Sequence, residues 1–517
     1  MHRVLCLTGL GLAFAAAPWS SQMLPMVHTT GETAKKPLPA TMTGGFAVFD
    51  YDNDGLLDLY FSNGGVFPAG RKSSPAHSNR LFRNHGGMRF ADTTNRAGVA
   101  GKDYAFGAAA ADFDNDGRVD LLVSELHGVT LYRNLGGGSF EDVTSKAGLD
   151  NRGRWAVASA WLDFDNDGDL DLFVGNYVEY DPATERTCLV NGKPDFCHPK
   201  YYPATSNALF LNRGNGTFDD VSEAVGLNAH KGKAMSLAVA DFDGNGYADV
   251  FVTNDRLFNS LFLNRGGQKF EESAFEWGVA VPGDGNPPSS MGADAQDIDR
   301  DGRPELTYAA LRDETFPLYW NTGKGFADRT AASRMSVLSR PMSGWAILFA
   351  DLDNDGWQDI LAARSDALSA SGGRAGTAKE PPAWFRNLGN SRFAAGPGWE
   401  GLPKAMYRGA MAADLNNDGC LDVILTALQE PPRILWNPCP AGARWLAVDV
   451  RQPGARVRVG EQWRIVSSAS GYSSSYAGPQ HFGLGEAAEA DVEVIWPGGR
   501  SKRLGKVAAG RRVKVEP

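Results

Sequence analysis

A short acidic pattern recurs seven times along this chain of 517 residues and constrains its fold more than any other feature. The pattern is Asp-x-Asp-x-Asp-Gly-x-x-Asp or a close variant, and the first copy places Asp50, Asp52, Asp54 and Asp58 at positions 1, 3, 5 and 9. Carboxylates this close repel one another unless a cation lies among them, and calcium accepts about six to eight oxygen ligands in flexible geometry. We therefore predict up to seven calcium sites in a modular, repetitive fold.

The other six loops supply their predicted ligands from the same four positions. These are Asp112, Asp114, Asp116 and Asp120; Asp163, Asp165, Asp167 and Asp171; Asp241, Asp243, Asn245 and Asp249; Asp297, Asp299, Asp301 and Glu305; Asp351, Asp353, Asp355 and Asp359; and Asp414, Asn416, Asp418 and Asp422. Asn245, Glu305 and Asn416 each remove charge or lengthen a ligand, so we expect weaker affinity in the fourth, fifth and seventh loops. Asp, Asn and Gly also favour turns without metal, but seven copies in register favour the metal.

The residues around the loops exclude an EF-hand. That motif begins in the same way but needs a bidentate Glu at position 12, where the first two loops have Phe61 and Val123. Short apolar, β-rich runs flank the loops instead, such as residues 46–49 before the first and 121–123 after the second. Such runs are typical of strands, so each loop is predicted to be a calcium-binding turn between two strands.

A second motif follows each loop: an aromatic or aliphatic pair, an Asn, usually a Gly-rich turn, and then Phe. In the first copy the Asn is Asn84 and the Phe is Phe90. Each unit thus predicts a four-stranded antiparallel blade, and the chain an all-β, seven-bladed β-propeller over residues 17–440. The seventh unit lacks a fourth strand. Because residues 26–30 resemble residues 90–94, we expect that N-terminal segment to complete the seventh blade as its outer strand.

The two ends of the chain differ from the repeats. Arg3, an apolar run at residues 4–17 and small residues near 13–15 predict a signal peptide over residues 1–16. The apolar run is too short to span a membrane, so we expect a secreted, periplasmic or cell-surface protein. Residues 441–517 contain no acidic loop but several short β-rich runs, which predicts a small C-terminal β domain.

Four cysteines remain after the predicted cleavage. Cys188 and Cys197 bracket a short loop, and Cys420 and Cys439 would lie across a hairpin. We therefore predict the local pairs Cys188–Cys197 and Cys420–Cys439 among the three possible connectivities. A zinc site is the weaker alternative, because no Cys-x-x-Cys occurs and only His198 lies nearby.

The acidic composition reflects the metal loops rather than a partner. The formal net charge is −10, and seven calcium ions would reverse its sign. Binding to nucleic acid would require a basic surface, which the composition does not suggest. We therefore predict no nucleic-acid partner.

The loops and the Asn-x-Gly-x-Phe turns resemble FG-GAP/VCBS repeats. The sequence H-F-G-L-G at residues 481–485, followed by V-E-V-I-W-P-G-G at 492–499, resembles the ASPIC/UnbV domain. With the insertion between Cys188 and Cys197, the arrangement is similar to bacterial relatives of the cartilage acidic protein family over nearly the whole mature chain. This resemblance implies a secreted, calcium-binding protein and implies no particular reaction.

Partner-binding residues are expected on the face opposite the metal loops. In an antiparallel blade the connections between second and third strands lie there, and they are longest at residues 64–78, 177–206 and 364–383. Long loops on a rigid scaffold commonly carry binding. The candidates are Arg152, Arg154, Trp155, Tyr201, Tyr202, Lys404, Tyr407 and Arg408. Such aromatic and basic side chains would suit an extracellular protein or an acidic glycan; a solvated rim with the aromatics packed beneath their own loops is the alternative.

These observations predict a monomeric adhesion or interaction module with structural metal loops. A lectin-like polysaccharide-binding protein is one alternative, and a polysaccharide-active enzyme that uses calcium to polarise a substrate carboxylate is another. No H-E-x-x-H or G-x-S-x-G sequence occurs, and no nucleophile and base pair is identified. We therefore predict no catalytic residue.

Overall fold

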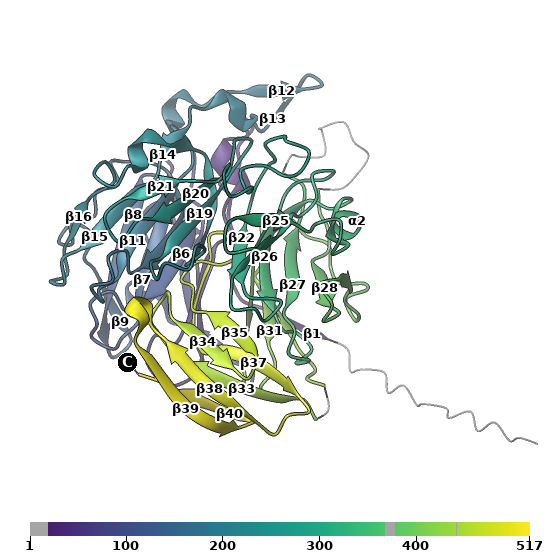
Figure 1. The fold of residues 1–517 in the computed structure, drawn as a ribbon. Coiled ribbons are helices and arrows are strands. Elements are labelled where there is room, and N and C mark those ends of the chain that lie inside the picture. Colours follow the sequence, from purple (N-terminus) through teal and green to yellow (C-terminus); the bar gives the residue numbers. More distant parts are fainter. Residues whose placement is uncertain (1–18, 368–377, 441, 517) are drawn as a thin grey trace, which may run out of the picture.

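The computed structural model describes residues 19–367, 378–440 and 442–516. Its regular structure is almost entirely strand, which confirms the predicted all-β class. Seven four-stranded antiparallel sheets form a ring, and a smaller β domain lies against one end of it (Figure 1). The first strands of successive sheets pack against one another around the middle of the ring. Each acidic loop joins the first strand of its sheet to the second, as predicted.

Six of the sheets use strands that follow one another in the chain. They are β2 (Phe46–Phe49), β3 (Asp58–Phe61), β4 (Arg80–Asn84) and β5 (Phe90–Asp92); β6 (Ala105–Ala111), β7 (Asp120–Glu125), β8 (Gly128–Gly136) and β9 (Ser139–Asp142); β10 (Ala156–Leu162), β11 (Asp171–Asn176), β15 (Ala208–Asn212) and β16 (Phe218–Asp220); β18 (Ala234–Ala240), β19 (Asp249–Asn254), β20 (Ser260–Asn264) and β21 (Phe270–Glu272); β22 (Ala293–Gln296), β23 (Glu305–Tyr308), β24 (Leu318–Asn321) and β25 (Phe326–Asp328); and β26 (Gly344–Ala350), β27 (Asp359–Arg364), β28 (Ala383–Asn387) and β29 (Phe393–Ala395).

The connections carry the remaining short elements of the ring. These are the strands β12 (Cys188–Val190), β13 (Lys193–Asp195), β14 (Thr205–Ser206) and β17 (Lys231–Gly232), the helices α1 (Thr94–Ala97) and α2 (Met335–Ser339), and the 3₁₀ helices η1 (Leu38–Thr41), η2 (Pro75–His77), η3 (Pro182–Thr184), η4 (Pro199–Tyr201) and η5 (Leu227–Ala229). No helix among the described residues is long and apolar enough to cross a membrane.

The seventh sheet contains both ends of the ring. It consists of β30 (Tyr407–Ala413), β31 (Asp422–Ala427), β32 (Arg433–Trp436) and the N-terminal strand β1 (Ser20–Met23), which pairs antiparallel with β32. An N-terminal strand does complete this sheet, but its predicted position near residues 26–30 was wrong. Residues 24–28 lie beside the connection between β31 and β32 instead, where Leu24 N donates to Pro432 O at 3.0 Å and His28 N to Glu430 O at 3.2 Å. The side chains of Leu24 and Met26 are buried. The predicted signal peptide lies outside the described residues.

An amide side chain from the third strand links most sheets to the preceding acidic loop. Asn134 Nδ2, for example, donates to the carbonyl oxygens of Val119 in its own sheet and Tyr51 in the first loop, at 3.0 and 2.8 Å. Asn84 closes the ring by donating to Leu415 O of the seventh loop at 2.7 Å. The equivalent links come from Asn212, Asn264, Asn321 and Asn437.

The sixth sheet makes this link in another way. Within the described residues, Asn387 Nδ2 donates only to Gln358 O, in its own sheet, at 3.0 Å. The side chain of Gln358 then reaches the fifth loop, where its Nε2 donates to Asp297 O at 2.9 Å. Every pair of neighbouring sheets is therefore joined by a buried amide.

The C-terminal domain is a pair of sheets. Its strands are β33 (Arg444–Asp449), β34 (Arg456–Val459), β35 (Gln462–Ile465), β37 (Gln480–Gly485), β38 (Glu489–Ile495), β39 (Ser501–Ala508) and β40 (Arg511–Lys514), with η6 (Pro497–Gly499) between β38 and β39. The sheets β37-β33-β40 and β35-β34-β38-β39 enclose a core that includes Leu446, Val457 and Phe482. Figure 1 shows this domain at the end of the ring opposite β12 and β13.

Residues 466–477 leave the C-terminal domain and enter the middle of the ring; we call this segment the plug. Ser468 Oγ donates to Trp161 O at 2.7 Å, and Gly471 exchanges backbone hydrogen bonds with Ala293. The plug ends in β36 (Ser475–Ala477), which pairs in parallel with β2. A segment made mostly of Ser, Gly and Ala is narrow enough to lie among the inner strands.

The amide links generate a prediction for stability. Replacing Asn134 by Ala leaves two buried carbonyl oxygens without their donors, whereas Asn387→Ala leaves one. Because each unpaired buried group costs about 1–3 kcal/mol, we expect Asn134→Ala to lower the free energy of unfolding by ~2–4 kcal/mol and Asn387→Ala by about half as much. Urea unfolding monitored by circular dichroism measures both, with the exposed Asn215→Ala as the control. Equal effects of the two buried substitutions would contradict the cross-sheet role of Asn134.

Candidate metal centres

Backbone hydrogen bonds fold each acidic loop around its first carboxylate. In the first loop, Asp50 Oδ1 accepts from Asp54 N and Asp50 Oδ2 from Gly55 N, each at 3.0 Å. Gly55 has a φ of 88°, a left-handed conformation that favours glycine. The invariable glycine at position 6 of the seven loops therefore makes the turn itself possible.

The acid at position 9 ties its loop to the third strand of its sheet. Asp58 Oδ2 accepts from Tyr51 N of the loop at 3.1 Å, and Asp58 Oδ1 accepts from Asn84 N of β4 at 2.7 Å. The same two bonds recur in the other six sheets. Their position-9 acids are Asp120, Asp171, Asp249, Glu305, Asp359 and Asp422. The Asn of the second sequence motif thus donates its backbone N–H to the position-9 carboxylate and, in most sheets, its side-chain amide to the preceding loop. The sequence pattern did not predict this double role.

Three carboxylates of the loop converge on one point. Ligand oxygens of Asp50, Asp52 and Asp58 lie within 4.8 Å of one another. The same holds for the sets Asp112, Asp114 and Asp120; Asp163, Asp165 and Asp171; and Asp241, Asp243 and Asp249. Calcium–oxygen distances are about 2.3–2.6 Å, so oxygens with this spacing fit around one ion.

Burial disfavours the ionised form of these carboxylates unless a cation lies close to them. The side chain of Asp58 is inaccessible to solvent, and burial raises its pKa to about 8. Burial likewise raises the pKa of Asp120, Asp171 and Asp422 to about 8 and that of Asp351 to about 7. A buried acid with a raised pKa is stabilised either by a proton or by a positive charge close to it.

Within the acidic loops, four buried carboxylate oxygens have no hydrogen-bond donor among the described residues. They are Asp52 Oδ1, Asp114 Oδ1, Asp163 Oδ1 and Asp353 Oδ1. These oxygens belong to the first, second, third and sixth loops, which are the loops with four aspartates. The donor set of these four loops therefore fits a hard divalent cation best, in line with the expectation of weaker affinity in the other three.

Arginines partly neutralise three of these loops from outside. Arg83 Nε lies 2.7 Å from Asp52 Oδ2, and Arg133 and Arg386 contact Asp114 and Asp353 in the same way. The third loop has Leu211 at the equivalent place. Among the described residues, no lysine or arginine forms an ion pair with that loop. Its carboxylates therefore have the greatest need for a bound cation.

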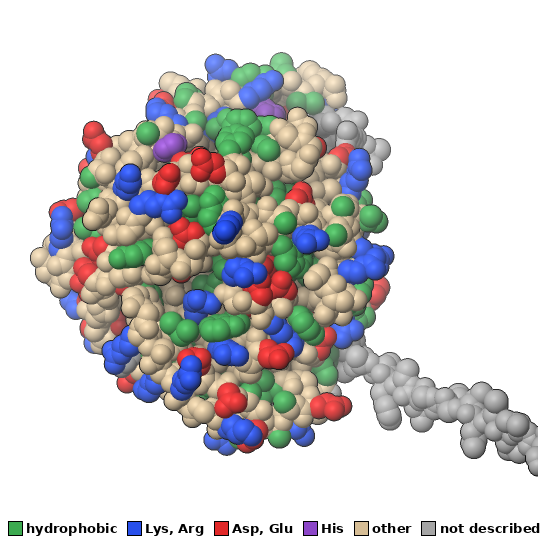
Figure 2. Space-filling view, viewed as in Figure 1, with side chains coloured by type: hydrophobic (Ala, Val, Ile, Leu, Met, Phe, Trp, Pro, Cys, Tyr) green, Lys and Arg blue, Asp and Glu red, His purple; other side chains and the backbone are tan. Residues whose placement is uncertain are grey.

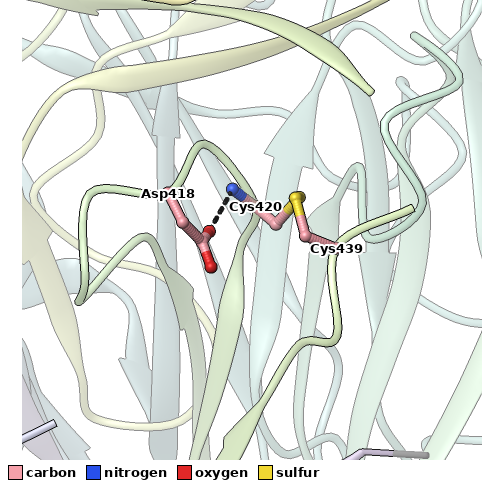
Figure 3. A group of neighbouring side chains, drawn as sticks. All are labelled: Asp418, Cys420 and Cys439. Atoms are coloured by element: carbon pink, nitrogen blue, oxygen red, sulfur yellow. Dashed lines mark hydrogen bonds between the residues drawn. A yellow bond between two sulfur atoms is a disulfide. The ribbon is translucent and has the colours of Figure 1, made fainter. Parts of the chain in front are cut away.

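The seventh loop is held by a disulfide. Both predicted pairs, Cys188–Cys197 and Cys420–Cys439, are present, so these sulfur atoms are not available to zinc. Figure 3 shows Cys420 beside Asp418, whose Oδ1 accepts from Cys420 N at 2.9 Å. The bond to Cys439 fixes the loop to the end of the third strand, near Asn437.

The loops also contact one another around the ring. The side chain at position 4 of one loop reaches the glycine carbonyl of the next, as in Asn53 Nδ2 to Gly117 O at 3.2 Å and Asn354 Nδ2 to Gly419 O at 2.9 Å. The fourth loop has Gly244 at this position and has no side chain with which to make the contact. The metal loops therefore form a nearly continuous band at one end of the molecule.

The C-terminal domain docks on this band through its H-F-G-L-G sequence. Gly483 N donates to Asp351 Oδ2 at 3.2 Å, and His481 Nε2 lies 3.0 Å from Gly419 O. A Cβ atom at position 483 would lie 2.2 Å from Asp351 Oδ2, so only glycine fits there. Arg451 and Arg512 contact the first loop, at Asn53 Oδ1 and Gly55 O.

The eight predicted partner-binding residues divide into two groups. Trp155, Tyr202, Tyr407 and Arg408 are buried, so their side chains offer no surface to a partner, and predicting them as contacts was wrong. Trp155, for example, packs against Phe106, Tyr177 and Tyr180, because aromatic residues of the connections fill the space beneath their own loops.

The other four candidates remain accessible. Arg154 is half-buried and Lys404 is exposed. Arg152 forms an ion pair with Asp220 at 2.8 Å. Tyr201 is 44% exposed, with the charged groups of Arg186 and Lys200 over its ring. These four lie on connections at the end away from the metal loops.

Two family models match the chain. The model described as "FG-GAP-like repeat" matches residues 50–123, 113–174, 191–252, 241–308 and 297–362. The model described as "ASPIC and UnbV" matches residues 450–517. The first covers more than half of the chain and coincides with the acidic loops, and the second coincides with the C-terminal domain.

The chain is similar to cartilage acidic protein 1 of several vertebrates. The Xenopus tropicalis protein is 24% identical over 502 residues, which cover 89% of this chain and 71% of that protein. The human protein is 25% identical over 361 residues, which cover 66% of this chain and half of that protein.

Solved structures show more distant likenesses. A lectin of Agrocybe aegerita that recognises non-reducing terminal N-acetylglucosamine has a TM-score of 0.42 and 17% identity, over 75% of this chain and 87% of that one. A rhamnogalacturonan lyase of Bacillus licheniformis has a TM-score of 0.38 and 13% identity, over 82% of this chain and 76% of that one. The fold, the loop geometry and the two family models together show that this chain belongs to the FG-GAP-like repeat family, with a C-terminal ASPIC and UnbV domain.

Proposed function

We propose that this protein is an exported calcium-binding propeller that acts as an interaction module. In this proposal the metal loops are structural, and the opposite end of the ring binds an extracellular protein or an acidic glycan. The observation that carries the calcium assignment is the buried, unpartnered carboxylate oxygen in each of the four complete loops. An oxygen of this kind is costly to bury unless a cation completes its coordination.

A structural role for calcium follows from where the loops lie. Each loop holds the second and third strands of its sheet together through the position-9 acid, and the position-4 side chains join one loop to the next. The C-terminal domain rests on the same band. A ligand that binds only the folded state stabilises it by mass action, so calcium would stabilise the ring and the domain contact together.

Export is supported by the disulfides. Two disulfides in one chain are typical of an oxidising compartment. The signal peptide proposed over residues 1–16 would supply the route. Fractionation of the native cells and N-terminal sequencing of the mature protein test this part, and a protein that retains Met1 in the cytoplasm would contradict it.

The end of the ring away from the C-terminal domain offers apolar surface. Figure 2 shows hydrophobic side chains gathered at that end, near β12 and β13. Leu189 of the β12–β13 hairpin is 63% exposed. Phe258, just before β20, and Phe275, just after β21, are 48% and 60% exposed. The rings of the two phenylalanines lie 4.8 Å apart. Exposed apolar groups of this kind are common at protein interaction sites, which favours a protein partner over the alternatives.

Two alternative activities have direct tests. Binding of purified protein to a glycan array would favour the lectin-like alternative. Turnover of uronic-acid polymers that co-purifies with the protein and is lost on chelation would favour the enzyme. Capture from native envelope or culture medium, compared between wild type and Phe275→Ser, tests the protein-partner proposal, and equal capture by both would contradict the assigned surface.

Chelation provides the first test of the metal assignment. We expect EDTA to lower the melting temperature and calcium to restore it, because one site at a hundredfold excess over its Kd stabilises by about 2.7 kcal/mol. Asp165→Asn in the third loop should reduce the calcium bound per chain by one ion, measured by metal analysis. Asp219→Asn, an exposed acid outside the loops, is the matched control. Unchanged melting and metal content after chelation would contradict the proposal.

The buried acids predict an inverted pH dependence in the chelated protein. Burial raises the pKa of the position-9 aspartates of the first, second, third and seventh loops to about 8 in the folded protein, well above the pKa of an aspartate in the unfolded chain. The folded state then binds more protons, so stability is lost as pH rises toward 8. Lowering the pH from 8 to 6 in EDTA should therefore raise the melting temperature. The corresponding gain in the free energy of unfolding is at most ~1.4 kcal/mol per pH unit for each group. Calcium-loaded protein should lack this trend, and scanning calorimetry compares the two.

A further inference from the structure

A cavity of about 120 Å³ lies at the end of the ring opposite the metal loops. It lies between the N-terminal segment that includes η1, the chain after β13, connections of the third to fifth sheets, and Ala367 beyond β27 of the sixth sheet. Its lining is mainly apolar, with Met42, Met235, Met291, Trp345, Leu38 and Phe196. A cavity of about 150 Å³ with such a lining holds one benzene molecule, so this one has the size of a small ring compound.

The floor of the cavity is held by the plug. Tyr472 OH donates to Met42 O at 2.9 Å, and its ring packs edge-on against Trp345 at 5.3 Å. The guanidinium of Arg408 lies 3.7 Å from the centre of the Trp345 ring, and Trp345 Nε1 donates to Ser365 O at 3.1 Å. The orientation of Trp345 is therefore fixed before any ligand enters.

One wall is fixed covalently. Residues 196–199 line the cavity immediately after β13, and the disulfide from Cys197 to Cys188 ties them to β12. Lys233 Nζ donates to Pro199 O at 2.7 Å and holds the same stretch against the fourth sheet. A cavity with a rigid floor and a tethered wall is preformed, which lowers the entropic cost of binding.

One buried carboxylate in the lining has unused capacity to accept hydrogen bonds. Asp255 is 6% exposed, and within the described part of the chain its side chain accepts one hydrogen bond, from Tyr177 OH to Oδ2 at 2.7 Å. An ionised carboxylate accepts about four. Burial raises the pKa of Asp255 to about 6, so the group is mainly ionised at neutral pH and its other oxygen is available to a donor.

The charges around the cavity indicate a neutral ligand. Arg256 lines the cavity and pairs with Glu314 at 2.8 Å, while Lys233 is occupied by Pro199 O. These two cations, with Arg408 behind Trp345, would repel a charged amine. The carboxylate of Asp255 would repel an anion. The ligand that best complements this lining is an apolar ring with one hydrogen-bond donor.

We propose that this cavity binds a small neutral ring compound whose single donor, a hydroxyl or a ring N–H, meets the free oxygen of Asp255. The ring lies among the three methionines and Trp345, where polarisable sulfur atoms make favourable contacts with aromatic faces. The site is independent of the metal loops and adds a small-molecule ligand to the proposed interaction module.

The test uses indole and 1-methylindole, which differ in the ring N–H. Titration of the full calcium-loaded chain by ligand-observed NMR should show that indole binds with a Kd at least about tenfold lower than that of 1-methylindole, the factor expected for one hydrogen bond to a buried carboxylate. Asp255→Ala should abolish this preference, and Asp150→Ala, an exposed acid at the same end of the ring, should leave it unchanged.

A second variant keeps the test decisive if Asp255→Ala folds poorly. Met235→Trp fills the cavity with a larger side chain and should weaken both probes at least tenfold. The proposal is overturned if neither probe binds the wild type at millimolar concentration. Equal affinity for the two probes would show that Asp255 does not bond to the ligand. Binding that Met235→Trp leaves unchanged would show that the ligand binds outside this cavity.

Discussion

The structure depends on one buried acid per sheet. The carboxylate at position 9 begins the second strand, is fully buried, and accepts backbone hydrogen bonds from its own loop and from the third strand. The Asn that supplies the second bond also sends its amide to the preceding loop in six of the seven sheets, as Asn84 does to Leu415. Loop, sheet and ring are therefore one network. A charge buried in such a network is destabilising unless it is compensated, so a cation bound at these loops would stabilise the folded ring itself.

The C-terminal domain extends this network. Its H-F-G-L-G sequence contacts the sixth and seventh loops, where Gly483 fits against Asp351. Its plug then occupies the middle of the ring and reaches the residues that form the floor of the opposite cavity, since Tyr472 contacts both Met42 and Trp345. The plug thus connects the C-terminal domain, which contacts the acidic loops, with the cavity at the opposite end of the ring. This arrangement leaves the end with the disulfide-tied hairpin as the accessible one.

The sequence predicted features that depend on residues close together in the chain and missed those that depend on distant contacts. The loop spacing, the position-9 acids, the long connections and both disulfides followed from local pattern, because each depends on residues close in the chain. The outer strand of the seventh sheet was predicted too late in the chain. The resemblance of residues 26–30 to residues 90–94 says nothing about which residues pair with β32. The burial of Trp155 and Arg408, and the course of the plug, depend on contacts between residues far apart in the chain. Local patterns do not encode those contacts.

In the three variant loops, side-chain hydrogen bonds and a disulfide hold the loop in place. In the fourth loop, Asn245 Nδ2 donates to Asn264 O at 2.9 Å and holds the loop against β20. Trp320 Nε1 donates to Asp299 Oδ2 of the fifth loop at 2.8 Å.

In the seventh loop, Asn416 Nδ2 donates to Asp418 Oδ2 at 2.8 Å, and the disulfide of Cys420 supplies a covalent brace. Each variant loop therefore has a hydrogen bond or disulfide of its own, and among the described residues none of its buried carboxylate oxygens is without a donor. The loop geometry is thus maintained around the ring by different interactions. If calcium binds as proposed, we expect the tightest sites in the four complete loops, whose unpartnered oxygens need a cation most.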